Sequence, residues 1–466
     1  MHGITLTNRP ADWEIIQQEN GFGSASLEGV YQVHPAAIQV GVESVRPVVR
    51  VMNEEDNSCV IPWTEMEHKT NPDFSGSFTY TLKIPVGGLY RIETSLETKS
   101  TVPELTWLYR GDTALHIGVG NLFIIAGQSN SAGHSWDYAQ DPPTLGVHLF
   151  RNRNLWDLAT HPMNESTLAG SLPNEEMGIP GVSPYLSFGR NFQTLSRCPV
   201  GLIQTALGGS PLSRWMPEDG DLYKNMADKL SMTKGKYAGV LWYQGCSDTD
   251  PDNAPSYYER FRKMVEALRD TLGYSIPFFT FQLNRQVDGL HDECWGIVRE
   301  AQRKAAQTIP DVYVLPTINC PISDGIHNSA HANVMLGEKL AKLCAHVLCG
   351  QEAFFAPALS GIALEEPRVL KLTFENMRLG FVLYSSAGDN SGFTLTDGDG
   401  EILVESLHSP RQAGNTLYLY LSREPKPDAL LSFCSGANPT MIPPVDEVTY
   451  LPPLAFDRIP VFGKDK

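Results

Sequence analysis

The pattern of hydrophobic and polar positions divides the chain into three regions. Up to about residue 118, short runs of β-branched and aromatic residues alternate with turn clusters such as NEEDN and PVGG, a pattern typical of strands. The clearest runs are RPVVRVMN, FTYTLKIP and LYRIETSLE. No segment here has a convincing helical period. We therefore expect an N-terminal β domain of the sandwich type over residues 1–118.

The middle region, residues 119–354, alternates between two patterns. Five apolar runs predict buried parallel strands: NLFIIA, VGLIQT, AGVLWYQ, PFFTFQL and VYVLPTI. Segments such as FRKMVEALRDTL, with apolar residues three and four apart, predict helices between the strands. Ser256 and Glu259 precede that stripe with the spacing of a capping box. The alternation predicts a doubly wound, three-layer α/β/α domain with a five-stranded parallel sheet.

The β pattern returns in residues 355–466. The runs RVLKLTFEN, LGFVLYS and NTLYLYLS are separated by segments rich in Gly, Asn, Asp and Pro, which predicts a C-terminal β domain, also of the sandwich type.

Composition narrows the possible partners. The chain has 466 residues, of which 42% are hydrophobic and 19% charged, as in folded globular proteins. Its net charge is −17 and no basic cluster is visible, so we expect neither nucleic acid nor an anionic membrane surface as a partner. No apolar run approaches membrane-spanning length. The eight cysteines form no C-x-x-C pair and no secretory leader is visible, which favours free thiols in the cytoplasm.

Polar and small residues follow four of the five predicted strands in a way that suggests one site. In open α/β sheets, ligands bind at the carboxyl ends of the strands, where the strand order reverses. These strand ends carry Gln128, Ser129 and Asn130 after the first run, Gly208 and Gly209 after the second, Gln244 after the third, and Asp324 and His327 after the fifth.

This set of residues fits acyl transfer from an ester. A serine hydroxyl such as that of Ser129 needs a base to take its proton, and His327 can serve. Asp324, three residues earlier, can orient the imidazole and stabilise its cationic form. The oxyanion requires fixed donors: the candidates are the Ser129 amide, a backbone amide at Gly208 or Gly209, and the Gln244 side chain.

Each feature also has a purely structural interpretation. Ser129 alone would be an ordinary turn hydroxyl, and the glycine pair would simply permit a tight bend. Asp324 and His327 would form an ion pair at a helix entry, and Gln244 a buried amide. A zinc site using His327 and His331 lacks the glutamate of H-E-x-x-H. We therefore expect no metal and no cofactor.

Four sequence blocks resemble a known family. The GQSN turn, the GGS-x-x-x-x-W loop, the WYQG-x-S-D segment and the DGIH element are similar to conserved blocks of SGNH-type hydrolases, specifically the sialate O-acetylesterase (SASA) branch and related carbohydrate acetylesterases. The resemblance implies a flavodoxin-like SGNH fold, Ser129 as nucleophile and Asp324 and His327 as its partners. One departure is Cys246, where the family usually has glutamate.

The implied function is a serine esterase that removes O-acetyl groups from a carbohydrate. Whether the sugar is a sialate, as for a 9-O-acetylesterase, or a plant glycan such as xylan, mannan or xyloglucan stays open. A carbohydrate-binding protein without activity and a lipid or thioester hydrolase are the alternatives from other classes. Candidate substrate contacts are Gln128, Asn130, Arg214, Trp215 and Arg285.

Overall fold

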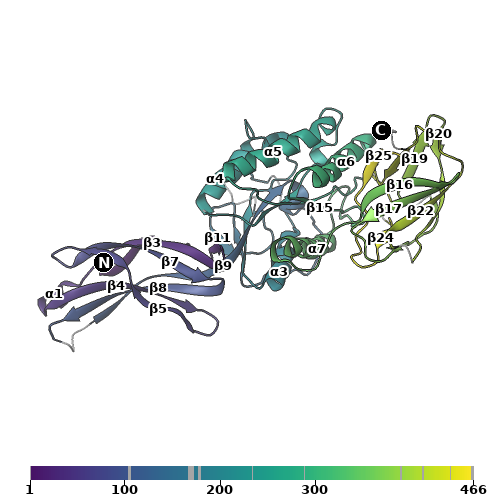
Figure 1. Ribbon diagram of the computed structural model, residues 1–466. Coiled ribbons are helices and arrows are strands. Elements are labelled where there is room, and N and C mark those ends of the chain that lie inside the picture. Colours follow the sequence, from purple (N-terminus) through teal and green to yellow (C-terminus); the bar gives the residue numbers. More distant parts are fainter. Residues whose placement is uncertain are drawn as a thin grey trace.

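The protein is elongated, with an all-β region at each end and an α/β region between them (Figure 1). This is seen in a computed structural model. The described residues are 2–102, 107–165, 173–176, 180–233, 235–287, 289–388, 391–411, 414–440 and 442–462.

The N-terminal region consists of two sheets around one core. Its elements are β1 (Gly3–Asn8), β2 (Ile15–Gln17), β3 (Phe22–Gln32), α1 (Pro35–Gln39), β4 (Val42–Asn53), β5 (Cys59–Glu65), β6 (Glu67–Thr70), β7 (Ser75–Pro85), β8 (Gly87–Ser100) and β9 (Trp107–Gly127). One sheet has the order β1-β3-β7-β6, and in the other β5, β4, β8 and β9 are successive neighbours. Leu27 and Phe78 of the first sheet share a core with Val49 and Ile92 of the second.

Strand β9 joins this region to the central one. Its first half pairs antiparallel with β8, and its second half lies between two parallel strands of the central sheet. The predicted boundary at residues 118 and 119 lies inside this strand. The two regions therefore share one continuous hydrogen-bonded sheet (Figure 1).

The central sheet is larger than predicted. Its further strands are β10 (Val147–Phe150), β11 (Trp156–Leu158), β12 (Val200–Gln204), β13 (Gly239–Tyr243), β14 (Phe278–Phe281) and β15 (Val312–Leu315). The five predicted strands occur in the order β12-β9-β13-β14-β15, but β10 adds a sixth parallel strand and β11 an antiparallel edge. The expectation of five parallel strands was wrong because β10 is the short run VHLF, in which a histidine interrupts the apolar residues.

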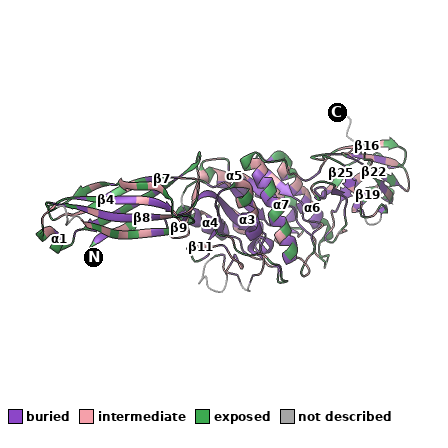
Figure 2. Ribbon diagram, turned by 90° about the horizontal axis from the view of Figure 1, so that it is seen from below, coloured by how far each residue is buried: buried purple, intermediate pink, exposed green. Residues whose placement is uncertain are grey.

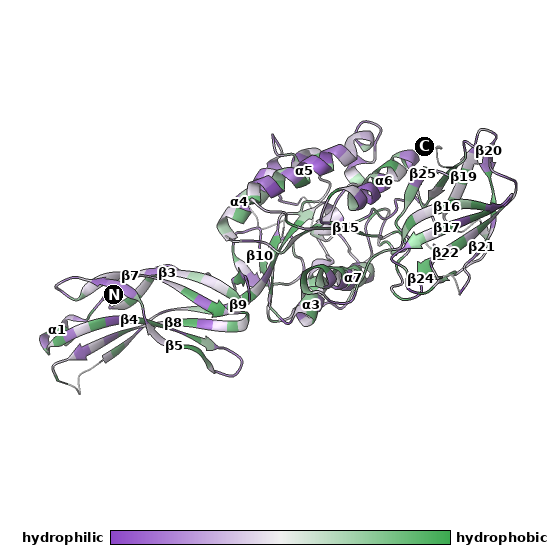
Figure 3. Cartoon of the chain, viewed as in Figure 1, coloured by the Kyte–Doolittle hydropathy of each residue, from purple (hydrophilic) through white to green (hydrophobic). Residues whose placement is uncertain are grey.

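Helices cover both faces of this sheet. They are α2 (Ser129–Ala132), α3 (Tyr185–Ser196), η3 (Leu212–Trp215), α4 (Asp221–Thr233), η4 (Cys246–Asp248), η5 (Ala254–Ser256), α5 (Tyr257–Leu272), α6 (Asp292–Thr308) and α7 (Ala330–Cys349). Helices α3 and α7 lie on one side and α4, α5 and α6 on the other (Figure 1). The strands between them are buried (Figure 2), and α5 turns a hydrophilic side to solvent (Figure 3).

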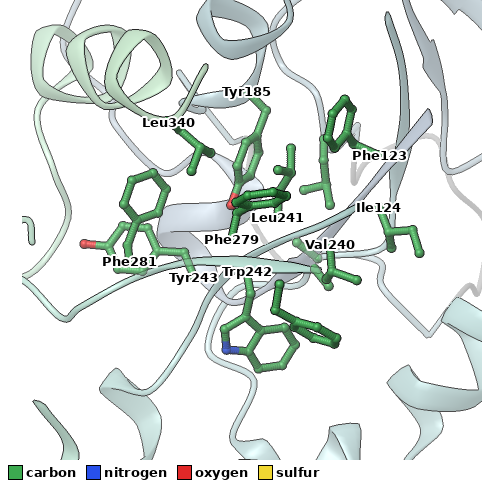
Figure 4. Close-up of a cluster of buried hydrophobic side chains, with 14 of the residues drawn as sticks. Phe123, Ile124, Tyr185, Val240, Leu241, Trp242, Tyr243, Phe279, Phe281 and Leu340 are labelled. Carbon is green, nitrogen blue, oxygen red and sulfur yellow. The ribbon is translucent and has the colours of Figure 1, made fainter. Parts of the chain in front are cut away.

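Side chains of β13 alternate between the two helical layers. Trp242 points away from Tyr185 and Leu340, which come from α3 and α7 (Figure 4), and its ring contacts Phe261 of α5 at 5.9 Å between centroids. The layer arrangement thus follows from period-two alternation along a doubly covered strand.

The cap predicted for α5 is absent, whereas α7 has one. Ser256 makes no side-chain cap to α5, because it ends the 3-10 helix η5 and its backbone (φ −99°, ψ 0°) lies outside the extended region that a capping residue adopts. The capping-box expectation was therefore wrong. Ser329 does cap α7, accepting a hydrogen bond from the Ala332 amide.

The C-terminal region has two four-stranded sheets around a shared core and a further sheet of two strands. Its strands are β16 (Ala358–Glu366), β17 (Val369–Glu375), β18 (Phe381–Val382), β19 (Phe393–Asp397), β20 (Gly400–Ile402), β21 (Val404–His408), β22 (Thr416–Leu421), β23 (Leu430–Phe433), β24 (Val445–Asp446) and β25 (Phe456–Pro460). The four-stranded sheets are β16-β17-β22-β21 and β20-β19-β23-β25. Leu372, Leu419 and Phe433 contribute to their common core. Across the described ranges, no helix has the length and apolar character needed to span a membrane.

Candidate active site

Ser129 lies where the parallel sheet changes direction. Strand β9 has β12 on one side and β13 on the other, and the chain crosses from one half of the sheet to the other around it. Gly127 ends β9 with φ +120°, and a Cβ there would lie 2.4 Å from the Tyr243 carbonyl oxygen, so only glycine fits. Ser129 follows as the first residue of α2, with 6% of its surface exposed. This is the position at which open α/β sheets bind ligands.

Asp324 and His327 form a hydrogen-bonded pair in a tight turn. Asp324 Oδ2 lies 2.6 Å from His327 Nδ1, while Asp324 Oδ1 accepts from the amides of Ile326 and His327. Partial burial raises the pKa of Asp324, but these hydrogen bonds together outweigh it, so the pKa is lowered from its ordinary value of 3.8. The carboxylate is therefore charged at neutral pH and fixes the orientation of the imidazole.

Asn328 ties the His327 turn to the Ser129 helix. Its amide donates to Asn130 Oδ1 at 2.9 Å, and its carbonyl accepts from the Ser135 hydroxyl. Its side chain, completely buried, contacts Asn284, Asn333 and Tyr243. Asn130, a predicted substrate contact, is thus 2% exposed and positions the histidine turn. This network joins the segment that begins with Ser129 to the turn that carries Asp324 and His327.

The donors predicted for the oxyanion separate into two groups. The amides of Ser129 and Gly209 meet no acceptor among the described residues. The Gly208 amide donates to Glu176 Oε1 at 2.6 Å. The Gln244 amide is fully buried and donates to Asp248 and to the Ser210 carbonyl. The assignment of Gln244 as a donor is corrected, because both of its N–H groups already have acceptors.

Three predicted substrate contacts have structural roles instead. Gln128 is 3% exposed and accepts from the amides that follow β13, at Gly245 and Ser247. Trp215 is completely buried and donates to Ser210. Arg214 forms a two-pronged ion pair with Asp221, so its charge is already neutralised. Sequence patterns could not show which of these side chains point inward.

Arg285 remains near the site without a carboxylate partner. Its Nη1 contacts Asn438 of the C-terminal region at 3.2 Å, and no acidic group of the described residues lies within ion-pair distance. Two residues later, the Val287 amide donates to the carbonyl of Gly325, in the turn between Asp324 and His327. Arg285 and Asn438 therefore lie next to the segment that carries the Asp–His pair.

Three side chains beside the site were missed by the sequence reasoning. The His134 ring lies 5.3 Å from that of His327, and its Nε2 lies 3.3 Å from Glu176 Oε2. The Trp136 ring lies 6.4 Å from the His327 ring. For His134 and Trp136 the available signal was their position in GHSW, which two residues separate from the GQSN block; Glu176 had no such signal.

The described residues offer neither a metal-ligand group nor a reactive thiol at the site. Among the described residues, no group of three or more His, Cys, Asp or Glu side chains is placed to hold a metal ion, and His331 is exposed on α7. Cys246 packs against the hydrophobic core, and burial raises its pKa to about 12. The residue that departs from the family pattern is thus a neutral thiol.

The low pKa of Asp324 predicts a pH-dependent contribution to stability. A carboxyl whose pKa is lower in the folded state stabilises the fold above its unfolded pKa, and the gain is lost as pH falls through the folded pKa. Asp324→Asn should therefore have a lower free energy of unfolding than wild type at pH 7, and the difference should shrink as pH falls below 3.8 and disappear only below the folded-state pKa. Urea unfolding at a series of pH values measures this. A constant difference across the series would contradict it.

A serine at the switch point of a parallel sheet, beside an Asp–His pair, places the protein among hydrolytic enzymes with α/β folds. Residues 119–346 match the family model described as carbohydrate esterase, sialic acid-specific acetylesterase, and this part of the chain belongs to that family. The protein is therefore an esterase of the carbohydrate acetylesterase type.

A solved structure shows the same fold along nearly its whole length. A carbohydrate acetylesterase from Xanthomonas citri superposes with a TM-score of 0.64 at 18% identity, covering 97% of this chain and 99% of that one. A protein from Arabidopsis thaliana gives a TM-score of 0.43 at 24% identity, with 49% and 99% covered. NanS gives 0.41 at 15% identity, with 50% and 98% covered. The comparison with curated protein sequences found no match.

Proposed function

We propose that this protein is a serine esterase that removes O-acetyl groups from a carbohydrate by way of an acetyl-enzyme. The observation that carries the proposal is the Asp324–His327 pair, tied through Asn328 to the segment that begins with Ser129. Family membership of residues 119–346 supports the substrate class.

In the proposed reaction, the Ser129 oxygen attacks the acetyl carbonyl carbon while His327 takes the serine proton. The bond between the carbonyl carbon and the sugar oxygen then breaks, and His327 returns the proton to that oxygen, which releases the sugar hydroxyl. Water, deprotonated by His327, attacks the acetyl-enzyme carbonyl carbon. The bond to the Ser129 oxygen then breaks, His327 returns the proton to that oxygen, and acetate leaves. Asp324 stays ionised throughout and stabilises the imidazolium.

The oxyanion formed in both steps needs N–H donors that are not already engaged. The Ser129 and Gly209 amides meet this requirement. Gly209 has φ +64°, and a Cβ there would meet nothing within 4 Å, so the surroundings of this amide are open. We assign these two amides as the donors, each worth on the order of 10²-fold in kcat.

The identity of the sugar rests on the surroundings of the site. Of the two arginines considered as substrate contacts, Arg214 is paired with Asp221, whereas Arg285 has no carboxylate partner in the described parts of the chain. The carboxylate of a sialate could pair with the positively charged Arg285, whereas a neutral plant oligosaccharide would need no such partner. All eight cysteines are free, which supports our further proposal of a reducing, cytoplasmic setting.

Chain-length preference tests the proposed activity. We expect p-nitrophenyl acetate to be hydrolysed with a kcat/KM at least ~10-fold above that for the butyrate and octanoate esters, because the loops that follow the strands are rich in Gly, Ser and Asn, which suits a short acyl group. Equal or higher activity on octanoate would favour a lipid or thioester hydrolase. Wild-type protein without activity on any ester would favour a carbohydrate-binding protein.

A further inference from the structure

The two most exposed large hydrophobic side chains of the described residues lie next to the catalytic turn. Tyr138 is 82% exposed and Trp136 is 69% exposed. They are only two positions apart and follow the nucleophile segment directly. Large aromatic surfaces of this kind are costly to leave in water and are enriched where a ligand covers them.

Trp136 is exposed although its neighbours are firmly held. Ser135 is buried, and its hydroxyl bonds to the Asn328 carbonyl and to the Asn333 side chain. On the other side, Asp137 Oδ1 accepts from the Ala330 amide at 2.8 Å. Both anchors belong to the segment immediately after His327. The ring is therefore presented to solvent from a backbone fixed to the catalytic turn.

The position of the Trp136 ring suggests a role in substrate binding. Its centroid lies 6.4 Å from the His327 centroid, with 41° between the ring planes. We propose that Trp136 is the stacking platform for the sugar ring of the substrate, and that this substrate is a pyranose acetylated on one of its own ring hydroxyls. The inference rests on the proposed function and deepens it by naming the substrate class.

The geometry of proton transfer supports this substrate class. His327 must reach the oxygen that leaves the acetyl group, at hydrogen-bond distance. When that oxygen is attached to a ring carbon, the C–H face of the same ring lies close enough to stack on Trp136. An acetyl group at the end of an exocyclic chain, as in a 9-O-acetylated sialate, would place the ring several bonds further from His327. Stacking on a neutral π face also requires no charge on the sugar, in keeping with the acidic net charge.

The test compares a sugar ester with an ester that has no ring. The two probes are tetra-O-acetyl-xylose and ethyl acetate. For Trp136→Ala, we expect the ratio of kcat/KM values, sugar ester over ethyl acetate, to fall about 10-fold, which corresponds to ~1.4 kcal/mol, chiefly through KM for the sugar ester. Trp136→Phe should retain most of the wild-type ratio, because a phenyl ring still offers a π face.

Tyr384→Ala is the matched control. Tyr384 is also an exposed aromatic, at 61%, but lies in the C-terminal region, and its removal should leave the ratio unchanged. A Trp136→Ala protein with normal circular dichroism and an unaltered ratio would overturn the platform. So would a wild-type enzyme that prefers 9-O-acetylated sialic acid to the xylose ester. Ester hydrolysis that does not depend on Ser129 would instead overturn the proposed function itself.

Discussion

Replacing Ser129 by alanine should lower kcat for p-nitrophenyl acetate by on the order of 10⁴-fold or more. The hydroxyl oxygen is the atom that forms the acetyl-enzyme, and α2 offers no other residue at the end of β9 to replace it. His327→Ala should cause a loss of similar size, because the serine then lacks its base. The double variant should lose little more than either single one, since the residues act as a unit.

Ser131→Ala is the appropriate control for this experiment. Ser131 lies two residues further along the same short helix, is completely buried, and bonds to the Ala126 carbonyl and the Tyr185 hydroxyl. Its replacement should keep kcat within about tenfold of wild type, because Ser129 and its base remain. Additive losses from Ser129→Ala and His327→Ala would show that the two residues do not form one catalytic unit.

Replacing Arg299 by alanine should lower the free energy of unfolding by at least ~3 kcal/mol. The guanidinium is completely buried and donates to five carbonyls, those of Leu283 and Asn284 after β14 and those of residues 434–436 in the C-terminal region. Burial lowers its pKa to about 10, so it stays charged at neutral pH. Without the guanidinium of Arg299, several buried carbonyls lose their donors at the junction of the central and C-terminal regions.

Urea unfolding of Arg299→Ala and of two comparison variants, Arg262→Ala and Arg299→Lys, measures this effect. Arg262→Ala removes an exposed arginine that pairs with Glu259 and Glu266 on α5, and should change the free energy of unfolding by less than about 0.5 kcal/mol. Arg299→Lys should be destabilised as well, because an ammonium cannot reproduce the planar fork. An Arg299→Ala protein within about 1 kcal/mol of wild type would mean that water satisfies the carbonyls. Because Asn284 also contacts Asn328, we expect esterase activity to fall as well.

The elements that the sequence predicted well are those with strong local patterns. The apolar runs became β9, β12, β13, β14 and β15, and the stripe in FRKMVEALRDTL became α5. Strand β10 was missed because a histidine interrupts its four residues, VHLF, and its place in the sheet depends on pairing with β12, which is distant in the chain. The cap at Ser256 failed because the 3-10 helix η5 precedes α5 directly and gives Ser256 a backbone conformation outside the extended region that a capping residue adopts.

The residues of the candidate site were easier to predict than the directions in which their side chains point. Asp324 and His327 are three residues apart, so the turn that pairs them is a local property. Gln244 was assigned to the oxyanion, and Arg214 and Trp215 to the substrate, from their place after strands, but each is engaged inside the protein. Conversely, Trp136 carries no motif, and only its exposure beside His327 draws attention to it.

The sequence by itself determined the alternation of strands and helices, the candidate nucleophile and its Asp–His partners, because each depends on contacts within a few residues or on a local period. The tertiary structure alone decided which amides are free for an oxyanion, which polar side chains are already satisfied, and which aromatic faces the solvent. Those properties depend on partners far apart in the chain, such as Asn130 with Asn328 or Gly208 with Glu176. No local pattern can specify such a pairing, because it arises only when the whole sheet and its helices are packed.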